Sequence, residues 1–277
     1  MRRRLWTSIV GAVAAVPLIT AADNLLKNGD AEADAANWNA KEVSIVSESP
    51  HSGKSCFLTA STIAQSTEMI EIDPSKTYKL TGWLKSADDK PTNVYLALVP
   101  FDKDKVQIQS QFANPVKGTE TTLAEGCKPE DKIIKVVDGS KWTTQQYGGV
   151  AFNADDSGEF KDLPNKETVL CGIKEAQKKG ASWEVTLEKP CGKSFPAGTK
   201  VREHTAGASF IYPWVSVKFQ CKEWKEGKGT IKGTAQTGLP GQQFWSGTKY
   251  VKVAILSLEG GKVAFDDIVF EEVKEAK

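Results

Sequence analysis

Two adjacent carboxylates, Asp266 and Asp267, stand in an otherwise apolar run near the end of the chain, residues 261–270. Its β-branched and aromatic residues are typical of a buried strand. On a strand the side chains alternate between two faces, so each carboxylate has apolar neighbours on its own face. An ionised carboxylate there needs a cation or several hydrogen-bond donors to offset its desolvation. We therefore expect a compensated charge inside a sheet, with residues 24–32 at the other end of the chain as its partner.

Catalytic chemistry has few candidates in this sequence. The only histidines are His51 and His204, which argues against a His-rich zinc site, and neither stands beside a nucleophile motif. Glycoside hydrolysis needs two carboxylates at a set separation, and none of the 35 acidic residues falls in a recognisable constellation. We expect no catalytic residue, and a glycan-active hydrolase or lyase with an unrecognised acid pair stays an alternative.

Aromatic residues offer a different chemistry, because an aromatic face can cover the C–H side of a sugar ring while amides bind its hydroxyls. Alternation over residues 78–85 places Trp83 on the polar face of its strand. Trp214 likewise points opposite to Val215 and Val217. The candidate ligand-binding residues are Trp83, Tyr95, Trp214, Gln243 and Trp245. Each aromatic could instead pack in the core or between sheets. Trp38 reads as a core residue.

Composition and the N-terminus indicate an exported protein. Residues 1–22 have a basic start, a short apolar centre and small residues at the exit, which together predict a signal peptide. Its removal takes away three arginines and leaves 33 basic against 35 acidic residues, so a nucleic acid is a poor partner. No later segment could span a membrane. Export, whether the protein is secreted, periplasmic or on the cell surface, permits disulfides among the five cysteines, whose pairing stays open.

The elements that must position these residues are short extended runs separated by turn residues, which predicts an all-β sandwich or jelly roll. The rhythm changes in residues 117–204, which we interpret as a nested β insertion with Trp142 and Trp183 in its own core. The expected division is a signal peptide (1–22), a sandwich in two parts (23–116 and 205–277) and the insertion between them. One larger sandwich containing all strands is the alternative.

Several motifs carry a family resemblance: "NLLKNGDAEA" near the mature start, "SPHSGKSCFLT", "YKLTGWLKS", "GTKYVKVAIL" and "GGKVAFDDIVFEE" at the end. They resemble secreted carbohydrate-binding modules with a galactose-binding-domain-like jelly roll. The central stretch weakly resembles small, barrel-like β insertions in secreted bacterial surface proteins.

The resemblance implies a structural calcium ion near the chain ends. Carried over to this sequence, its ligands would be Glu32, the turn from His51 to Lys54, and Asp266 or Asp267. Calcium prefers six to eight oxygen ligands, which carboxylates and turn carbonyls supply. Salt bridges or hydrogen bonds from backbone N–H groups are the alternative. Ala31 stands where the family usually has an aromatic residue.

The function expected from these observations is non-catalytic binding of a poly- or oligosaccharide on an aromatic-bearing sheet face or loop rim. A structural or adhesive surface protein with the same fold and no sugar site is the alternative, since fold alone does not settle function.

Overall fold

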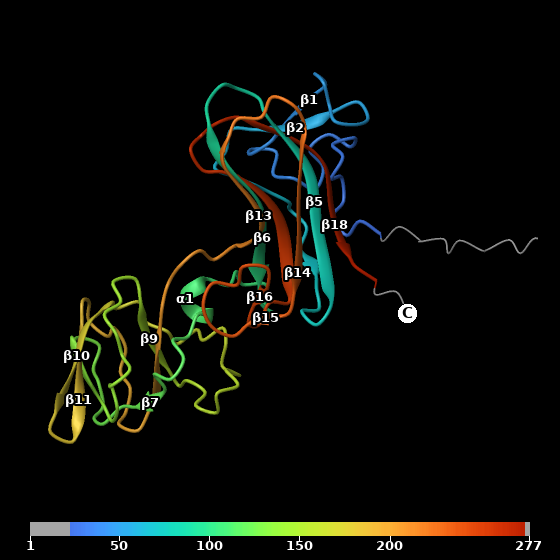
Figure 1. The fold of residues 1–277 in the computed structure, drawn as a ribbon. Coiled ribbons are helices and arrows are strands. Elements are labelled where there is room, and N and C mark those ends of the chain that lie inside the picture. The colour runs from blue at the N-terminus through green and yellow to red at the C-terminus, as the bar shows by residue number, and fades with distance from the viewer. Residues whose placement is uncertain (1–22, 275–277) are drawn as a thin grey trace, which may run out of the picture.

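The computed structural model describes residues 23–274, which form an almost entirely β protein (Figure 1). The expected signal peptide, residues 1–22, lies outside the described residues. Two five-stranded antiparallel layers build a jelly-roll sandwich, as the sequence predicts. The first sheet contains β1 (Ser44–Val46), β2 (Cys56–Thr59), β18 (Val263–Glu272), β5 (Thr77–Ser86) and β14 (Lys225–Lys232), in that order.

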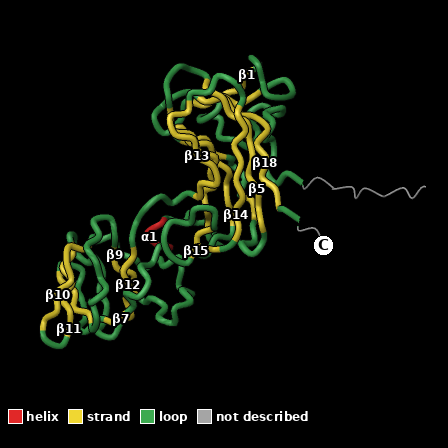
Figure 2. Tube along the Cα trace, viewed as in Figure 1, coloured by secondary structure: helices red, strands yellow, loops and turns green. Residues whose placement is uncertain are grey.

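The second sheet runs in the order β13-β6-β17-β3, with β4 also paired to β17. Its strands are β13 (Ile211–Phe219), β6 (Thr92–Phe101), β17 (Tyr250–Ser257), β3 (Ile63–Gln65) and β4 (Ile70–Glu71). A short parallel pair, β15 (Thr234–Ala235) and β16 (Phe244–Trp245), and one helical turn, α1 (Ser110–Ala113), lie at the end from which the insertion leaves (Figure 2).

The sandwich core follows from strand alternation. Tyr78, Leu80 and Leu84 of β5 point inward and are buried, as the period of two predicts. Trp38 is 3% exposed, with its ring centroid 5.1 Å from those of both Phe57 and Phe265. Its indole N–H donates to the carbonyl of Asn28, which satisfies the one polar atom that burial would leave unpaired. Its assignment to the core is confirmed.

The start of the chain is bound along the closing strand. The amide of Leu25 donates to the carbonyl of Phe270, and the amide of Ile268 donates to that of Gly29. Asn24 adds two side-chain hydrogen bonds to β18. A Cβ at Gly29 would overlap the carbonyl oxygen of Ile268, so only glycine allows this close approach. The two chain ends therefore meet at β18.

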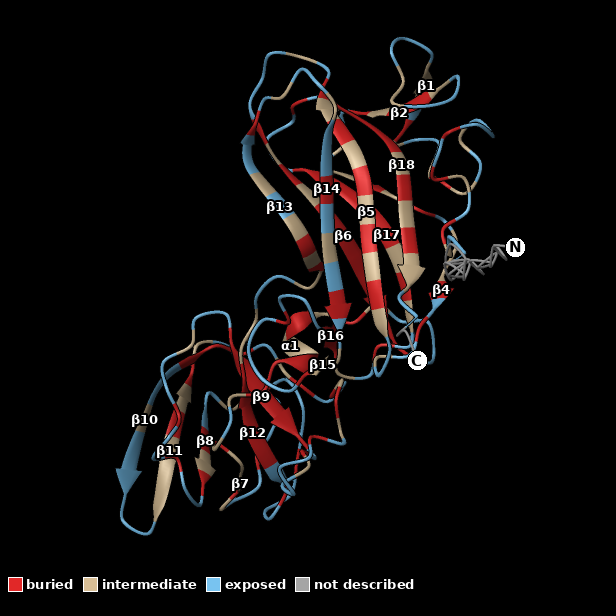
Figure 3. Cartoon of the chain, turned by 45° about the vertical axis from the view of Figure 1, so that its right-hand side comes forward, coloured by how far each residue is buried: buried red, intermediate tan, exposed pale blue. Residues whose placement is uncertain are grey.

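Residues 117–204, which we interpreted above as a nested insertion and call the insertion below, contain two three-stranded sheets separate from those of the sandwich (Figure 3). One has the order β7 (Thr121–Thr122), β12 (Lys200–His204), β9 (Gly149–Phe152). The other has the order β10 (Ile173–Lys179), β11 (Ser182–Leu187), β8 (Ile133–Val136). A core of its own joins them and includes Trp142, with Trp183 packed against it, as expected. The strands β10 and β11 form an antiparallel hairpin.

The insertion leaves and rejoins the sandwich at one place. The amide of Thr205 donates to the carbonyl of Asn114 at 3.0 Å, and Pro115 pairs with His204. Its two ends are thus neighbours, which is the geometry that tolerates insertion of a domain. Folding of the sandwich without it stays a prediction.

We expect replacement of residues 117–204 by a short Gly/Ser linker to leave the sandwich folded, because the linker has only to join ends that already touch. The measurement is a cooperative thermal transition with near-ultraviolet signal from buried Trp38. A soluble product without that signal, or an insoluble one, would favour one continuous folding unit.

Candidate functional site

The carboxylate of Asp266 is fully buried in β18 and is held by a turn that follows β1. Its Oδ2 accepts the backbone N–H of His51 (2.9 Å) and of Ser52 (3.2 Å), and its Oδ1 accepts that of Asp267 (2.8 Å). Burial raises the pKa of this carboxyl group and the nearby charge of Asp267 adds to that, whereas the three N–H donors lower it. The expected compensation of a buried charge is therefore present as hydrogen bonds, but the donors belong to His51, Ser52 and Asp267 and not to the expected partner, residues 24–32.

Glu32 holds the second half of the same turn. Its Oε1 accepts the backbone N–H of Lys54 (2.6 Å) and of Ser55 (3.0 Å). Gly53 lies against this carboxylate with φ +61, and a Cβ there would overlap it. Two carboxylates from opposite ends of the chain thus bind one turn through its N–H groups.

These contacts decide how the residues compare with the calcium site that the resemblance implies. Calcium would need carbonyl and carboxylate oxygens converging on one point, whereas the turn presents N–H donors to Glu32 and Asp266. Lys54 takes part through its amide and not its carbonyl. Within residues 23–274 no group of three or more His, Cys, Asp or Glu side chains is placed to hold a metal ion. This arrangement does not fit calcium, because peptide units of the turn would have to rotate to present their carbonyl oxygens. Calcium binding stays a prediction.

Trp83 lies on the outer face of the first sheet, and the same turn covers it. The ring of His51 stacks on its indole with centroids 4.0 Å apart and planes 15° from parallel. Asp267 orients that imidazole through a 2.6 Å contact with Nδ1. Trp224 packs edge-on against His51, and Lys85 lies over the ring of Trp224. The face of Trp83 expected to meet a ligand is thus occupied by His51.

Trp214 faces the sandwich interior, so its expected placement on a ligand-facing surface is wrong. Pairing with β6 shifts register between Ile211 and Trp214, and Trp214 stands opposite Leu96 of the core. Its ring packs against Gly227 of β14 and Phe219. The bulge reverses the alternation, which leaves Val215 and Val217 42% and 66% exposed.

The loop candidates also separate. Trp245 is fully buried and donates its indole N–H to the carbonyl of Ser209 at 2.8 Å, so no sugar ring can stack on it. Gln243 is exposed in a tight loop that is closed by the hydrogen bond from its backbone N–H to the carbonyl of Pro240. These two residues form no joint site.

Tyr95 is partly exposed on the outer side of the second sheet, β13-β6-β17-β3. Its ring centroid is 5.0 Å from that of Tyr212, and Phe210 lies 6.3 Å beyond Tyr212. All three are partly buried and belong to a cluster on this side of the sheet. Burial, and then the neighbouring Tyr95, raises the pKa of the Tyr212 hydroxyl. Phe210 and Tyr212 were missed, although they alternate with the core residue Ile211 and so share a face.

Cross-strand pairing defines the rest of this outer face. Ala97 of β6 pairs with Ala254 of β17, which pairs with Gln65 of β3. Two residues further along these strands, Val99 of β6 pairs with Lys252 of β17. Small side chains therefore lie between Tyr95 and Tyr212 at one end and the Phe101–Tyr250 pair at the other. We call this surface, defined by Tyr95, Ala97, Tyr212, Tyr250 and Ala254, the tyrosine face.

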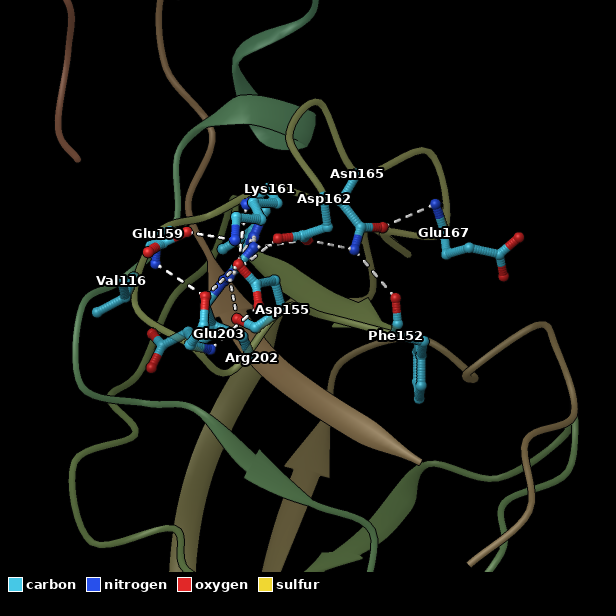
Figure 4. A network of polar contacts seen from close by, with 12 residues as sticks. Val116, Phe152, Asp155, Glu159, Lys161, Asp162, Asn165, Glu167, Arg202 and Glu203 are labelled. Carbon is cyan, nitrogen blue, oxygen red and sulfur yellow. Dashed lines mark hydrogen bonds and ion pairs between the residues drawn. The ribbon is translucent and has the colours of Figure 1, made fainter. Parts of the chain in front are cut away.

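A buried polar network at the base of the insertion had no signal in the sequence (Figure 4). Arg202 is fully buried and pairs with Asp162 at 2.9 Å. It also donates to Nε2 of His204 at 3.1 and 2.9 Å, and His204 Nδ1 contacts the carbonyl of Gln111 at 2.8 Å. Because arginine can only donate, Nε2 is an acceptor and the imidazole is neutral with its proton on Nδ1. This network joins the insertion to α1.

His204 is thereby removed from acid–base chemistry. It is fully buried, and burial followed by the charge of Arg202 lowers its pKa to about 4. Its function in this structure is to connect Arg202 to the backbone of α1.

Residues 23–147 match a family model described as a carbohydrate binding domain. The resemblance to carbohydrate-binding modules is confirmed. The matched stretch contains the first part of the sandwich, including Tyr95, and reaches into the insertion. None of the curated proteins matches this chain.

The solved structures similar to this chain include three carbohydrate-binding modules. The CBM22-1 xylan-binding domain of Paenibacillus barcinonensis Xyn10C has a TM-score of 0.40 and 9% identity, covering 92% of this chain and 98% of that one. A family 16 carbohydrate-binding module-2 has a TM-score of 0.39 and 12% identity, with coverages of 91% and 100%. TmCBM61 in complex with beta-1,4-galactotriose has a TM-score of 0.33 and 12% identity, with coverages of 91% and 99%.

The calcium prediction can be tested by chelation. An ion bound only to the native state stabilises it, by about 2.7 kcal/mol at a hundredfold excess over its dissociation constant. Calcium at Glu32 and Asp266 therefore predicts a lower melting temperature in chelator and metal in elemental analysis. Unchanged melting with no metal present would leave the N–H bonds as the whole compensation. As a control, Asp104→Asn changes an exposed carboxylate remote from the turn, and its melting temperature should respond to chelator as that of the parent does.

We expect the insertion to lose stability as pH falls from about 6.5 to about 4, because the unfolded state takes up a proton on His204 before the folded state does. The loss attributable to this group approaches roughly 3 kcal/mol. His204→Gln keeps an acceptor for Arg202 and does not titrate, so the denaturant midpoint of this variant should change less with pH over this range. Burial raises the pKa values of Glu203 and Asp266, whose contributions have the opposite sign and are common to both proteins. Parallel curves for the two proteins would contradict this role.

Proposed function

We propose that this protein binds a poly- or oligosaccharide on the tyrosine face and does not cleave it. The observation that carries the proposal is the adjacent pair of Tyr95 and Tyr212 rings, partly exposed on the outer side of the second sheet. The family match over residues 23–147 supports a saccharide as the ligand class.

The chemistry of the tyrosine face suits a sugar. Aromatic rings cover the C–H side of a pyranose, and their hydroxyl groups remain available at the ring edge. Gln65 and Lys252 stand on the same side of the sheet and offer an amide and an ammonium group to sugar hydroxyls. Ala97 and Ala254 are fully buried under the surrounding side chains, so a ligand would contact the rings and the polar side chains and not the sheet backbone.

Other aromatic residues are less suitable. His51 covers Trp83, Trp245 is fully buried, and Trp214 packs inside the sandwich. The proposed site therefore keeps Tyr95 from the sequence-based candidates and replaces the tryptophans by Tyr212 and Phe210.

Binding without hydrolysis is supported by the composition of the tyrosine face. Along the described strands β3, β6 and β17, the outward-facing positions carry no carboxylate. Glu71 of β4 stands opposite Tyr250 but is paired with Lys249, whereas glycoside hydrolysis uses two carboxylates. Export, predicted by the sequence of residues 1–22, would bring the site to extracellular glycans.

We expect Tyr95→Ala and Tyr212→Ala each to weaken polysaccharide binding roughly tenfold to a hundredfold, because each removes an apolar surface that the ligand would bury. Binding is measured as retardation in gels containing soluble xylan, glucan or galactan. Tyr→Phe at either position should keep most of the affinity, since the ring remains.

Two controls make this experiment decisive. Val217→Ala changes an exposed residue of the same edge strand and should bind like the parent. Trp83→Ala alters the opposite sheet, so a loss of binding there with intact binding in Tyr95→Ala would move the site to the surface around His51. Full binding by folded Tyr95→Ala and Tyr212→Ala would reject the tyrosine face.

A further inference from the structure

Three of the five cysteines lie together in the core of the insertion. Cys127, Cys171 and Cys191 are 5%, 1% and 0% exposed. The Sγ atoms of Cys127 and Cys191 are 3.5 Å apart, although the residues are 64 positions apart in the chain. Among the described residues, no sulfur contact of this kind joins Cys56, Cys171 or Cys221 to another cysteine.

Backbone hydrogen bonds hold this pair of cysteines in place. The amide of Cys127 donates to the carbonyl of Phe195 at 2.9 Å, and the amide of Phe195 donates back at 3.1 Å. The amide of Cys191 donates to the carbonyl of Asp131 at 2.8 Å. The approach of the two sulfur atoms is therefore set by pairing between the segments that carry them, and does not depend on side-chain rotation alone.

We propose that Cys127 and Cys191 form an intramolecular disulfide that closes the insertion, and that Cys56, Cys171 and Cys221 remain thiols. In the reaction, one thiolate attacks a small-molecule disulfide such as glutathione disulfide and releases one thiol. The second thiolate then displaces the other glutathione from the mixed disulfide. The protein loses two protons and two electrons in forming the S–S bond, and the reagent takes them up to become two thiols.

The position of this bond determines what it would do. It joins the segment before β8 to the segment after β11, so both strands lie within the closed loop. A cross-link over 64 positions strongly restricts the unfolded chain and therefore favours the folded insertion. The bond is internal to the insertion, so its effect falls there and not on the tyrosine face.

Burial also affects when the bond can form. It raises the pKa of the Cys191 thiol to about 12 and that of Cys171 to about 11, so the folded protein holds little thiolate at these positions. We expect oxidation to be slow in the folded state and rapid during folding, while the thiols are accessible.

The experiment is to refold the full chain with mixed reduced and oxidised glutathione and to count thiols in denaturant with a maleimide reagent. We expect three reactive thiols of the five, and a peptide map that links Cys127 to Cys191. Reductant should lower the midpoint of the insertion's unfolding by about 10 °C. Five free thiols, or a link that includes Cys171, would overturn the assignment.

Variants supply the matched comparison. Cys171→Ala should keep the link and the response to reductant, whereas Cys127→Ala combined with Cys191→Ala should abolish both. If the double variant fails to fold, the thiol count and peptide map of the parent still decide the question. Polysaccharide retardation of the oxidised and reduced parent is measured in parallel, and failure of the disulfide leaves the result for Tyr95 and Tyr212 unaffected.

Discussion

The burial of Asp266 is the constraint on which this end of the sandwich depends. A carboxylate with no exposed surface, in the middle of the closing strand, must be compensated by donors or by a cation. The turn at His51 and Ser52 supplies two N–H groups, and this brings the chain between β1 and β2 across the outer face of the first sheet. The same contact places the imidazole of His51 between Asp267 and Trp83. One buried charge thus fixes a turn, and this turn covers Trp83, the aromatic residue that the sequence most favoured as a surface for stacking a sugar ring.

Much of the fold follows from the sequence, because strands with turn residues between them leave a strong periodic pattern. The inward side chains of β5, the core position of Trp38 and the separate core around Trp142 all follow from alternation and composition. The need to compensate Asp266 follows from its apolar neighbours. Whether carbonyls or N–H groups face that carboxylate depends on peptide orientation in the turn, which residue types do not encode.

The ligand-facing surface was harder to predict, since alternation gives relative faces but not which face meets solvent. A bulge can also reverse the alternation of side chains along a strand. After Ile211 such a bulge places Trp214 opposite Leu96, and the indole ring of Trp214 then points into the sandwich. Trp83 does lie on the outer face of its sheet, but a turn distant in the sequence covers it through the ring of His51. Tyr95 lies on the outer face, because no bulge separates it from the inward residues Val94 and Leu96. The Arg202 network lay beyond reach, because Asp162 and His204 meet only after folding.

The insertion and the tyrosine face are connected through the segment that joins them. His204 contacts the carbonyl of Gln111 in α1. Phe210, six residues after His204, lies at the edge of the tyrosine face. Between them, Ser209 accepts the indole N–H of Trp245 on its carbonyl and donates through its hydroxyl to Gln109. This joining segment is therefore fixed at both ends, by the insertion's buried network and by a fully buried tryptophan of the sandwich. Pairing of β13 with β6 places Tyr212 beside Tyr95, whereas the fixed segment that leads into β13 limits where Phe210 lies at the edge of that face. An insertion at this site can thus shape the proposed binding surface without contributing a residue to it.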